Sequence, residues 1–248
     1  GVPLLKSIDF GKTWESIGFD NMHGDHQALW VNPNRSGHLI AGNDGGLNIS
    51  YDAGKNWMKH NSTSVGQFYD INIDMNDPYN VYGGLQDNGV WMGPSDYKSS
   101  LRWHSSGQYP WKSILGGDGM QTEIDFRDNE TVYTGSQFGN YARVNTRTGE
   151  RKRITPSHKL GEKPYRWNWE TPIYLSRHNQ DILYMGSNKF HRSLNQGNDF
   201  ETLSADLTNG GIKGNVSYGT LTTIIESELK YGLIYVGSDD GLIHISKD

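Results

Sequence analysis

The chain has 248 residues and a formal net charge of −5, and it is 34% hydrophobic, 12% aromatic and 21% charged. It contains no cysteine, which excludes disulfides, thiolate catalysis and cysteine-ligated metal. Its longest basic run is Arg151–Arg153, and no apolar stretch reaches the roughly 18 residues of a membrane span. We therefore expect neither a nucleic-acid surface nor a transmembrane segment. The many glycines and aromatic residues favour short strands joined by tight turns.

A short apolar strand that ends in glycine recurs along the chain. Four copies carry tyrosine two residues before the glycine, and they begin at residues 81, 132, 183 and 234, so successive copies are 51 residues apart. A fifth copy without the tyrosine covers residues 39–42. Such regular spacing indicates a repeat architecture.

Each copy of this strand lies inside a larger unit with a constant internal order. An apolar or alternating strand comes first, at 28–31, 69–73, 120–124, 172–175 and 221–225. A turn, the glycine-ended strand and two further strands follow, as in 46–50 and 57–59. Four short antiparallel strands in 40 to 50 residues form one blade of a β-propeller. The sequence therefore predicts an all-β fold, a propeller of four-stranded antiparallel blades, with full blades at 20–62, 63–110, 111–160 and 165–210 and partial blades at 1–18 and 215–248.

Two octapeptides, at 7–14 and 50–57, share the pattern Ser-x-Asp-x-Gly-x-Thr/Asn-Trp, and 193–200 is a degenerate copy. The aspartate accepts backbone N–H groups across a turn, the glycine supplies a positive φ, and the tryptophan packs between sheets. We expect Trp14, Trp57 and Phe200 to lie in the core between blades. The residues that build the two complete turns are Ser7, Asp9, Gly11, Trp14, Ser50, Asp52, Gly54 and Trp57.

These octapeptides resemble the Asp-box of the neuraminidase-repeat (BNR) β-propeller superfamily. Longer segments, at 24–30, 42–46, 83–89, 116–119 and 167–172, are similar to exported bacterial proteins described as sortilin-like or glycosyl-hydrolase-like. The resemblance implies a secreted, cell-surface or periplasmic location, in a bacterium. Because both ends of the chain supply a third strand of a blade, we expect the native protein to continue on both sides, with seven or more blades.

The turns between second and third strands lie on the same face of a propeller as the entries to the first strands. Aromatic and short polar side chains therefore converge there on one mouth, which is a composition that suits a sugar. Core packing and a sugar platform fit the two tryptophans of this set equally well. We predict that the ligand is held by Asp25, His26, Gln67, Asn88, Gln137, Trp167, Trp169, Glu170 and Asp239.

Three aspartates are candidate catalytic residues, namely Asp44, Asp87 and Asp118. Paired carboxylates suit glycoside hydrolysis. Asp44, which precedes two glycines, resembles the catalytic Asp of xyloglucanase-like relatives. The same aspartates also fit tight turns, where Asp before Gly needs no chemistry. The histidines of 23–26 are expected to be hydrogen-bonded, and we predict no metal site and no cofactor.

Three functions are compatible with these observations. A module that binds a glycan or a protein at the mouth is favoured, because no diagnostic set of catalytic residues is present. The alternative is a carbohydrate-active enzyme, either a glycoside hydrolase or a polysaccharide lyase, that uses the three aspartates. The third is a structural segment of a large surface protein. Sialidase activity is not expected, because the mouth segments lack the three arginines that clamp a carboxylate. Further blades or domains of the same chain are the other expected partners.

Overall fold

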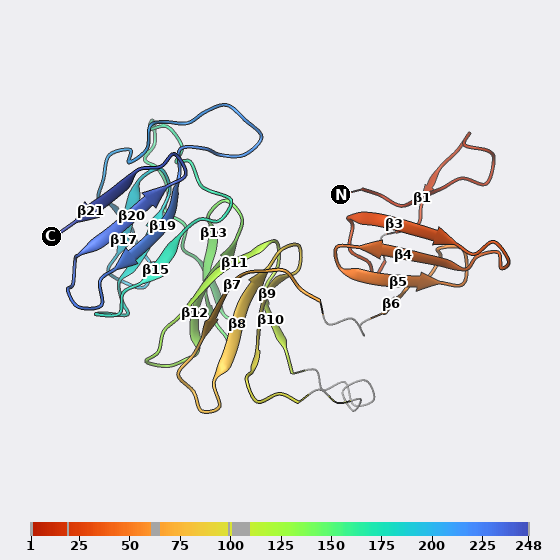
Figure 1. Ribbon diagram of the computed structural model, residues 1–248, viewed down its shortest axis with the longest axis horizontal. Helices are drawn as coiled ribbons and strands as arrows, with labels where there is room; N and C mark the ends of the chain where they lie inside the picture. Colours follow the sequence, from red (N-terminus) through yellow and green to blue (C-terminus); the bar gives the residue numbers. More distant parts are fainter. Residues whose placement is uncertain (1, 19, 61–64, 99, 101–109, 248) are drawn as a thin grey trace. The chain divides into compact units, whose positions relative to one another are not determined.

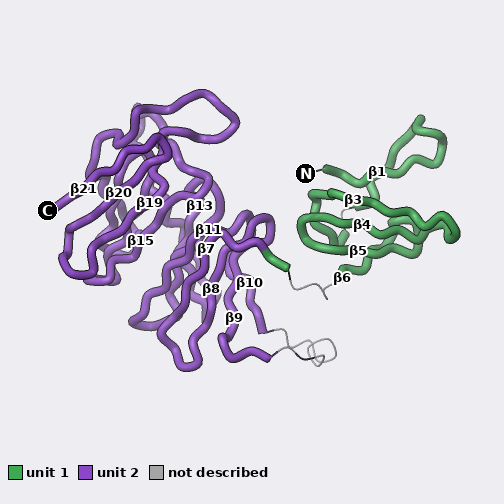
Figure 2. Tube along the Cα trace, in the orientation of Figure 1, with its two compact units in different colours: residues 1–66 green, residues 67–248 purple. Residues whose placement is uncertain are grey.

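A computed structural model describes residues 2–18, 20–60, 65–98, 100 and 110–247, and the expected blade boundaries at 1, 62–63 and 248 lie outside these ranges. The described residues form 21 strands and no helix (Figure 1), so they contain no helix that could cross a membrane. The chain divides into two compact units, residues 1–66 and 67–248 (Figure 2).

The first unit contains a two-stranded and a four-stranded antiparallel sheet. Its core consists of Leu4, Leu39, Ala41 and Trp57. It therefore contributes one full blade and one partial blade. The small sheet pairs β1 (Leu5–Lys6) with β2 (Glu15–Ser16), and the larger one pairs, in chain order, β3 (His26–Val31), β4 (Leu39–Asn43), β5 (Gly46–Ser50) and β6 (Met58–His60).

The second unit contains three four-stranded sheets and one three-stranded sheet, each with neighbouring strands in chain order. The first has β7 (Phe68–Ile73), β8 (Asn80–Leu85), β9 (Gly89–Pro94) and β10 (Lys112–Leu115). The second has β11 (Gly119–Ile124), β12 (Thr131–Ser136), β13 (Asn140–Asn145) and β14 (Arg151–Arg153). The third has β15 (Ile173–Leu175), β16 (Leu183–Gly186), β17 (Phe190–Ser193) and β18 (Glu201–Thr202), and the last has β19 (Leu221–Glu226), β20 (Ile234–Ser238) and β21 (Ile243–Ser246).

The first strands of these sheets lie next to one another. Strand β7 contacts β11, β11 contacts β15, and β15 contacts β19, so the sheets stack face to face through successive first strands. This is the arrangement of propeller blades. The all-β propeller of four-stranded antiparallel blades is therefore confirmed, with four full and two partial blades in the described chain. A total of seven or more blades stays a prediction.

The repeated tyrosines lie in the interior of the second unit. Tyr82, Tyr133 and Tyr184 are fully buried, whereas Tyr235 is 38% exposed on the last described sheet. The Tyr82 hydroxyl donates to Asp74 at 3.1 Å, and the Tyr184 hydroxyl donates to Glu226 at 3.0 Å. The buried Tyr133 hydroxyl has no hydrogen-bond partner among the described residues. The repeated tyrosine thus donates a buried hydrogen bond in two copies, whereas in a third its buried hydroxyl has no partner among the described residues.

Gly84, the second-last residue of β8, allows the next blade to approach closely. A Cβ atom on Gly84 would lie 2.2 Å from the Met120 carbonyl oxygen, and one on Gly119 would lie 2.3 Å from the Gly89 oxygen. Real Cβ atoms do not reach such distances, so any side chain here would force the two sheets apart. This contact explains why this copy of the repeated strand needs glycine.

The octapeptide turns have the hydrogen bonds expected from their sequence. Asp9 accepts the Thr13 backbone N–H at 2.8 Å, and Asp52 accepts that of Asn56 at 2.9 Å. Hydrogen bonds from the same two partners, Thr13 and Asn56, hold the pKa of each carboxyl down at about 2. In both turns the glycine and the residue before it have positive φ, for example 86° at Gly54 and 61° at Ala53.

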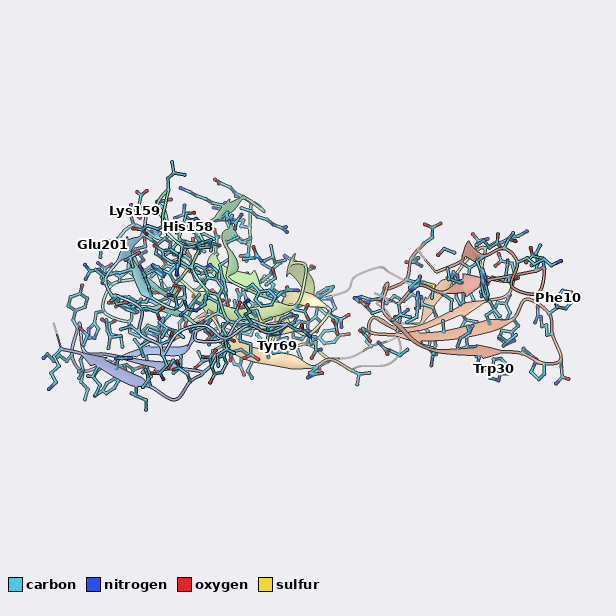
Figure 3. The ribbon with its side chains drawn as sticks, turned by 90° about the horizontal axis from the view of Figure 1, so that it is seen from above. Phe10, Trp30, Tyr69, His158, Lys159 and Glu201 are labelled. Carbon is cyan, nitrogen blue, oxygen red and sulfur yellow. The ribbon has the colours of Figure 1, made fainter. Side chains whose placement is uncertain are left out.

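The aromatic residues at the ends of the octapeptides differ in burial. Trp57 is buried in the core of the first unit, and Phe200 packs against the core of the second unit. The expectation for Trp14 is wrong, because its side chain is 62% exposed. Its ring Nε1 donates to the Gly11 oxygen of its own turn at 3.1 Å, beside a sheet of only two strands. Figure 3 shows Phe10 and Trp30 at the surface of the same unit, where both are exposed.

Candidate functional site

Two long connections meet at one end of the second unit. One joins β14 to β15 and the other joins β18 to β19, and both extend beyond the sheets (Figure 1). Arg166 of the first connection donates from Nε to the Gly219 oxygen at 3.0 Å and from Nη2 to Asp206 at 2.8 Å. The turn between β12 and β13 joins them, because the Phe138 N–H donates to the Trp169 oxygen at 3.3 Å. This is the face on which the mouth was predicted.

A pocket of about 460 Å³ lies between these segments, and we call it the aromatic pocket. Four aromatic rings and two cationic side chains contribute to its lining, and none of the described lining residues is acidic. Its size is within the range of small-molecule sites. The lining residues are Phe138, Tyr165, Arg166, Trp167, Ile212, Lys213, Gly214, Asn215, Val216, Ser217 and Tyr218.

The Trp167 ring is held in place by its neighbours. It lies over the His191 ring, with centroids 5.7 Å apart and planes inclined by 31°, and edge-on to Tyr165 at 6.1 Å. A Cβ atom on Gly139 would lie 2.8 Å from the Trp167 ring, so glycine at this turn makes room for the indole. Contacts with His191 and Tyr165 therefore fix the position of the indole without a ligand.

The support beneath Trp167 is uncharged at neutral pH. His191 is fully buried, and burial, together with the charge of Lys189, lowers its pKa to about 4. The Ser187 hydroxyl lies 2.7 Å from Nε2, and the Thr202 hydroxyl lies 3.0 Å from Nδ1. Both ring nitrogens therefore have partners, and the imidazole orientation is fixed.

Two of the predicted catalytic residues form a structural clamp. Asp118 is 9% exposed and accepts the Asp87 N–H at 3.0 Å and the Gln137 side-chain amide at 2.8 Å. These bonds join the turn after β8 to the turn after β12. Asp87 itself has a φ of 61°, a backbone conformation typical of a tight turn. Asp87 thus lies in a tight turn, and Asp118 links two turns of neighbouring sheets.

A tyrosine that the sequence did not single out lies beside one of the predicted tryptophans. Tyr69 on β7 (labelled in Figure 3) accepts a hydrogen bond from Trp169 Nε1 at 3.0 Å. Burial raises the pKa of Tyr69 first, and the charges of Asp118, Glu170 and Asp87 raise it further. Trp169 thus contacts Tyr69 directly, and the Phe138 ring lies next to Trp169, with centroids 5.2 Å apart.

Three other predicted ligand-binding residues of the second unit make contacts outside the aromatic pocket. Asp239 accepts the backbone N–H groups of Gly219 and Thr220 at 2.9 and 3.0 Å, which ties the end of one connection to the turn after β20. Asn88 donates to the Gln86 oxygen at 3.0 Å within its own turn. The backbone of Gln67 accepts the Gln86 N–H at 2.9 Å, and its side chain is exposed. None of these contacts involves the aromatic pocket.

Asp44, Asp25 and His26 belong to the first unit. Asp44 lies in the turn between β4 and β5 and accepts a hydrogen bond from the Gln27 amide at 3.1 Å. Asp25 lies beside it, because the Asp44 N–H donates to the Asp25 oxygen at 3.2 Å. His26 is 8% exposed, with Nε2 3.3 Å from the Gly18 oxygen, so it packs in the interior of this unit.

The carboxyl groups with raised pKa values lie on strands, not in the turns. Burial raises the pKa of Glu123 on β11 to about 7 and also raises that of Asp70 on β7. The Glu123 side chain is 13% exposed, lies 3.9 Å from Arg177, and has one oxygen without a hydrogen-bond partner in the described chain. Sequence reasoning missed this pair, because a single acidic residue in a short strand has no distinguishing pattern.

Sequence reasoning also missed most of the aromatic pocket. Trp167 was singled out, but Tyr165 and the segment 212–217 were not. The alternation Tyr165-Arg166-Trp167 was a usable signal, since every second residue there is aromatic. The segment 212–217 has no comparable signal, because its contribution depends on a contact across more than forty residues.

No protein-family model matches the chain, and no curated protein matches it. Among solved structures it is similar to the GH74 enzyme of Niastella koreensis, with 19% identity and a TM-score of 0.48 over 97% of this chain and 40% of that chain. It is also similar to the GH74 xyloglucanase of Xanthomonas campestris, with 14% identity and a TM-score of 0.49 over 97% and 40% of the two chains. A third is YCF48 bound to D1 peptide, with 11% identity and a TM-score of 0.48 over 98% and 72%. The chain thus spans 40% of the length of either GH74 protein.

Proposed function

We propose that this chain is part of an exported bacterial β-propeller of the Asp-box kind that binds a glycan in the aromatic pocket. The main observation in favour is the Trp167 ring, which packs on His191 and lines a pocket of about 460 Å³. Sugar rings present C–H faces that pack on aromatic rings and hydroxyl edges that need polar partners. The pocket provides both kinds of group, with Asn215, Ser217 and Arg166 beside the aromatic rings.

A glycan fits this pocket better than a folded protein does. A protein partner needs a contact surface of roughly 800 Å² on each side, which is usually flat and extended. The aromatic pocket is a hollow with a few polar groups, and its two cationic side chains would donate hydrogen bonds to hydroxyl or carboxylate oxygens of a saccharide. Binding at such a site needs no catalytic group, and the lining includes no carboxylate.

A carbohydrate-active enzyme is the second candidate, and one observation favours it. Asp70 and Glu123 interact electrostatically, and both have raised pKa values, as a general acid in glycoside hydrolysis requires. Glu123, however, has an oxygen buried away from solvent, which a reacting group has to expose to its substrate.

Further blades of the native chain are the other proposed partners. The face of the last sheet carries three isoleucines that are largely exposed, Ile225 at 54%, Ile243 at 76% and Ile245 at 54%. Apolar side chains of this size on the flat face of a sheet favour coverage by another sheet. A following blade would provide that cover in the same way as β11 covers β7.

The test separates binding from cleavage. The protein is run on native affinity gels that contain plant, algal or bacterial polysaccharides, and the same polysaccharides are assayed for release of reducing ends. We expect retardation by at least one polysaccharide without cleavage, and loss of retardation in the Trp167→Ala variant. Cleavage that disappears in Glu123→Gln or Asp44→Asn would establish the enzyme instead. No retardation by any polysaccharide would refute the glycan proposal.

A further inference from the structure

Two loops of the first unit bring three metal-ligating side chains together. His23 and Asp25 precede β3, and Asp44 lies between β4 and β5. One ligand atom from each of the three lies within 4.8 Å of the other two, and His23 Nδ1 is 3.6 Å from Asp25 Oδ2. All three residues are partly accessible to solvent. We call this group the His23 cluster.

The surrounding backbone holds the His23 cluster in place. The Asp44 N–H donates to the Asp25 carbonyl oxygen at 3.2 Å, which fixes the two loops side by side. The Gln27 amide donates to Asp44 Oδ1 at 3.1 Å, so it orients this carboxylate. Amide contacts of this kind position the ligands of protein metal sites.

Gly45 provides the space for the histidine. A Cβ atom on Gly45 would lie 2.8 Å from the Cβ atom of His23, which is too close for a side chain. Glycine next to Asp44 therefore allows residue 23 to approach the turn between β4 and β5 closely.

The ligand set indicates which ion fits. Zinc takes imidazole nitrogen at about 2.0–2.1 Å and carboxylate oxygen at about 2.0–2.2 Å. Two such ligands at roughly tetrahedral angles lie about 3.4 Å apart, and the three candidate ligand atoms of the His23 cluster all lie within 4.8 Å of one another. Calcium and magnesium prefer sites made entirely of oxygen, which the imidazole disfavours. The two carboxylates would balance the charge of a divalent ion.

We propose that His23, Asp25 and Asp44 bind one divalent cation of the zinc class. The proposal goes beyond glycan binding, since the aromatic pocket belongs to the second unit and contributes none of these residues. It also departs from the expectation of no metal, because the sequence did not show that Asp44 lies beside 23–25. His26 is not a ligand, since its Nε2 lies against the Gly18 oxygen in the interior. The bound ion would join the entry of β3 to the turn after β4 and stabilise the first unit.

The experiment uses the whole chain after treatment with a chelator. Titration with Zn²⁺ at pH 7.5, followed by calorimetry, should give one site per chain, and thermal unfolding should shift upward with added Zn²⁺. His23→Ala and Asp44→Asn should each weaken that site at least tenfold. His38→Ala and Asp20→Asn are matched controls in the same unit and should bind Zn²⁺ like the unaltered protein.

A second probe covers the case in which a variant folds poorly. Gln27→Ala keeps all three ligands, and we expect it to bind Zn²⁺ more weakly while its unfolding temperature without metal is nearly unchanged. Co²⁺ bound in place of Zn²⁺ should give visible absorption bands that disappear in His23→Ala. Three results would overturn the proposal: no stoichiometric Zn²⁺ binding, equal binding by His23→Ala and the unaltered protein, or preference for Ca²⁺ over Zn²⁺.

Discussion

Replacing the buried Glu123 by glutamine should stabilise the protein above pH 7 and have little effect below pH 4.5. The ordinary pKa of glutamate is 4.5, and burial raises that of Glu123 to about 7. Below pH 4.5 the carboxyl is protonated in both the folded and the unfolded chain. Between pH 4.5 and 7 only the unfolded chain ionises readily, so the free energy of unfolding falls, and above pH 7 the loss is complete.

The size of this effect follows from the two pKa values. Each pH unit between them costs about 1.4 kcal/mol, so ionised Glu123 should destabilise the fold by about 3 kcal/mol. Glutamine has the shape of the protonated acid and avoids this cost. Arg177, at 3.9 Å, is too distant for a direct hydrogen bond and is 41% exposed, so water can solvate it in the variant.

Urea unfolding of both proteins at pH 4, 5, 6, 7 and 8 measures the difference. The Glu123→Gln variant should gain stability relative to the unaltered protein from pH 5 upward, with a plateau above pH 7. Glu201→Gln is a matched control, because Glu201 is 65% exposed and pairs with Arg192 at the surface. If Glu123→Gln were less stable than the unaltered protein at pH 8, the ionised carboxylate would be stabilising the fold, and the reasoning would be refuted.

Three further predictions follow from the blade contacts and the pocket. Gly84→Ala should destabilise the second unit by about 3 kcal/mol in chemical unfolding, because its Cβ would lie 2.2 Å from a backbone oxygen. Gly116→Ala should be nearly neutral, because a Cβ atom there would have no neighbour within 4 Å. Equal effects of the two substitutions would contradict the close approach of the sheets at Gly84. Tyr133→Phe should leave the free energy of unfolding unchanged or raise it, whereas Tyr82→Phe should lower it by about 1 kcal/mol. Of these two hydroxyls, only that of Tyr82 donates a buried hydrogen bond. The opposite ranking would show that the Tyr133 hydroxyl has a partner. Glycan affinity should be constant from pH 5 to 8, because His191 beneath Trp167 has a pKa of about 4; an affinity that fell steeply between pH 7 and 6 would indicate that His191 is protonated there.

The blades were predictable because each is specified by local sequence. The apolar strand with Tyr82 and its copies at Tyr133 and Tyr184 fixes the second strand of a sheet, and the turn around Asp52 fixes the passage from the third strand to the fourth. These patterns need only neighbouring residues, and the predicted first strands agree with the observed ones to within about two residues. Trp14 differs because its burial depends on what covers its sheet, not on its own turn.

The candidate sites were less predictable because they depend on contacts between distant segments. Asp118 was singled out as an acid, but the Asp87 N–H and the Gln137 amide engage it in a clamp between blades. Trp167 was singled out without its partners, since the pocket needs the segment 212–218 and a neutral His191 beneath the ring. Asp44 lies beside His23 across two loops that are separate in the sequence, and a Cβ atom on Gly45 would lie 2.8 Å from that of His23.

The most direct test compares two tryptophan variants in one binding assay. Trp167 lies in the aromatic pocket, and Trp30 is 46% exposed in the first unit. Calorimetric titration with the oligosaccharide of a polysaccharide that retards the protein should show at least tenfold weaker binding by Trp167→Ala and unchanged binding by Trp30→Ala. Unchanged binding by Trp167→Ala would contradict the assignment of the aromatic pocket as the glycan site.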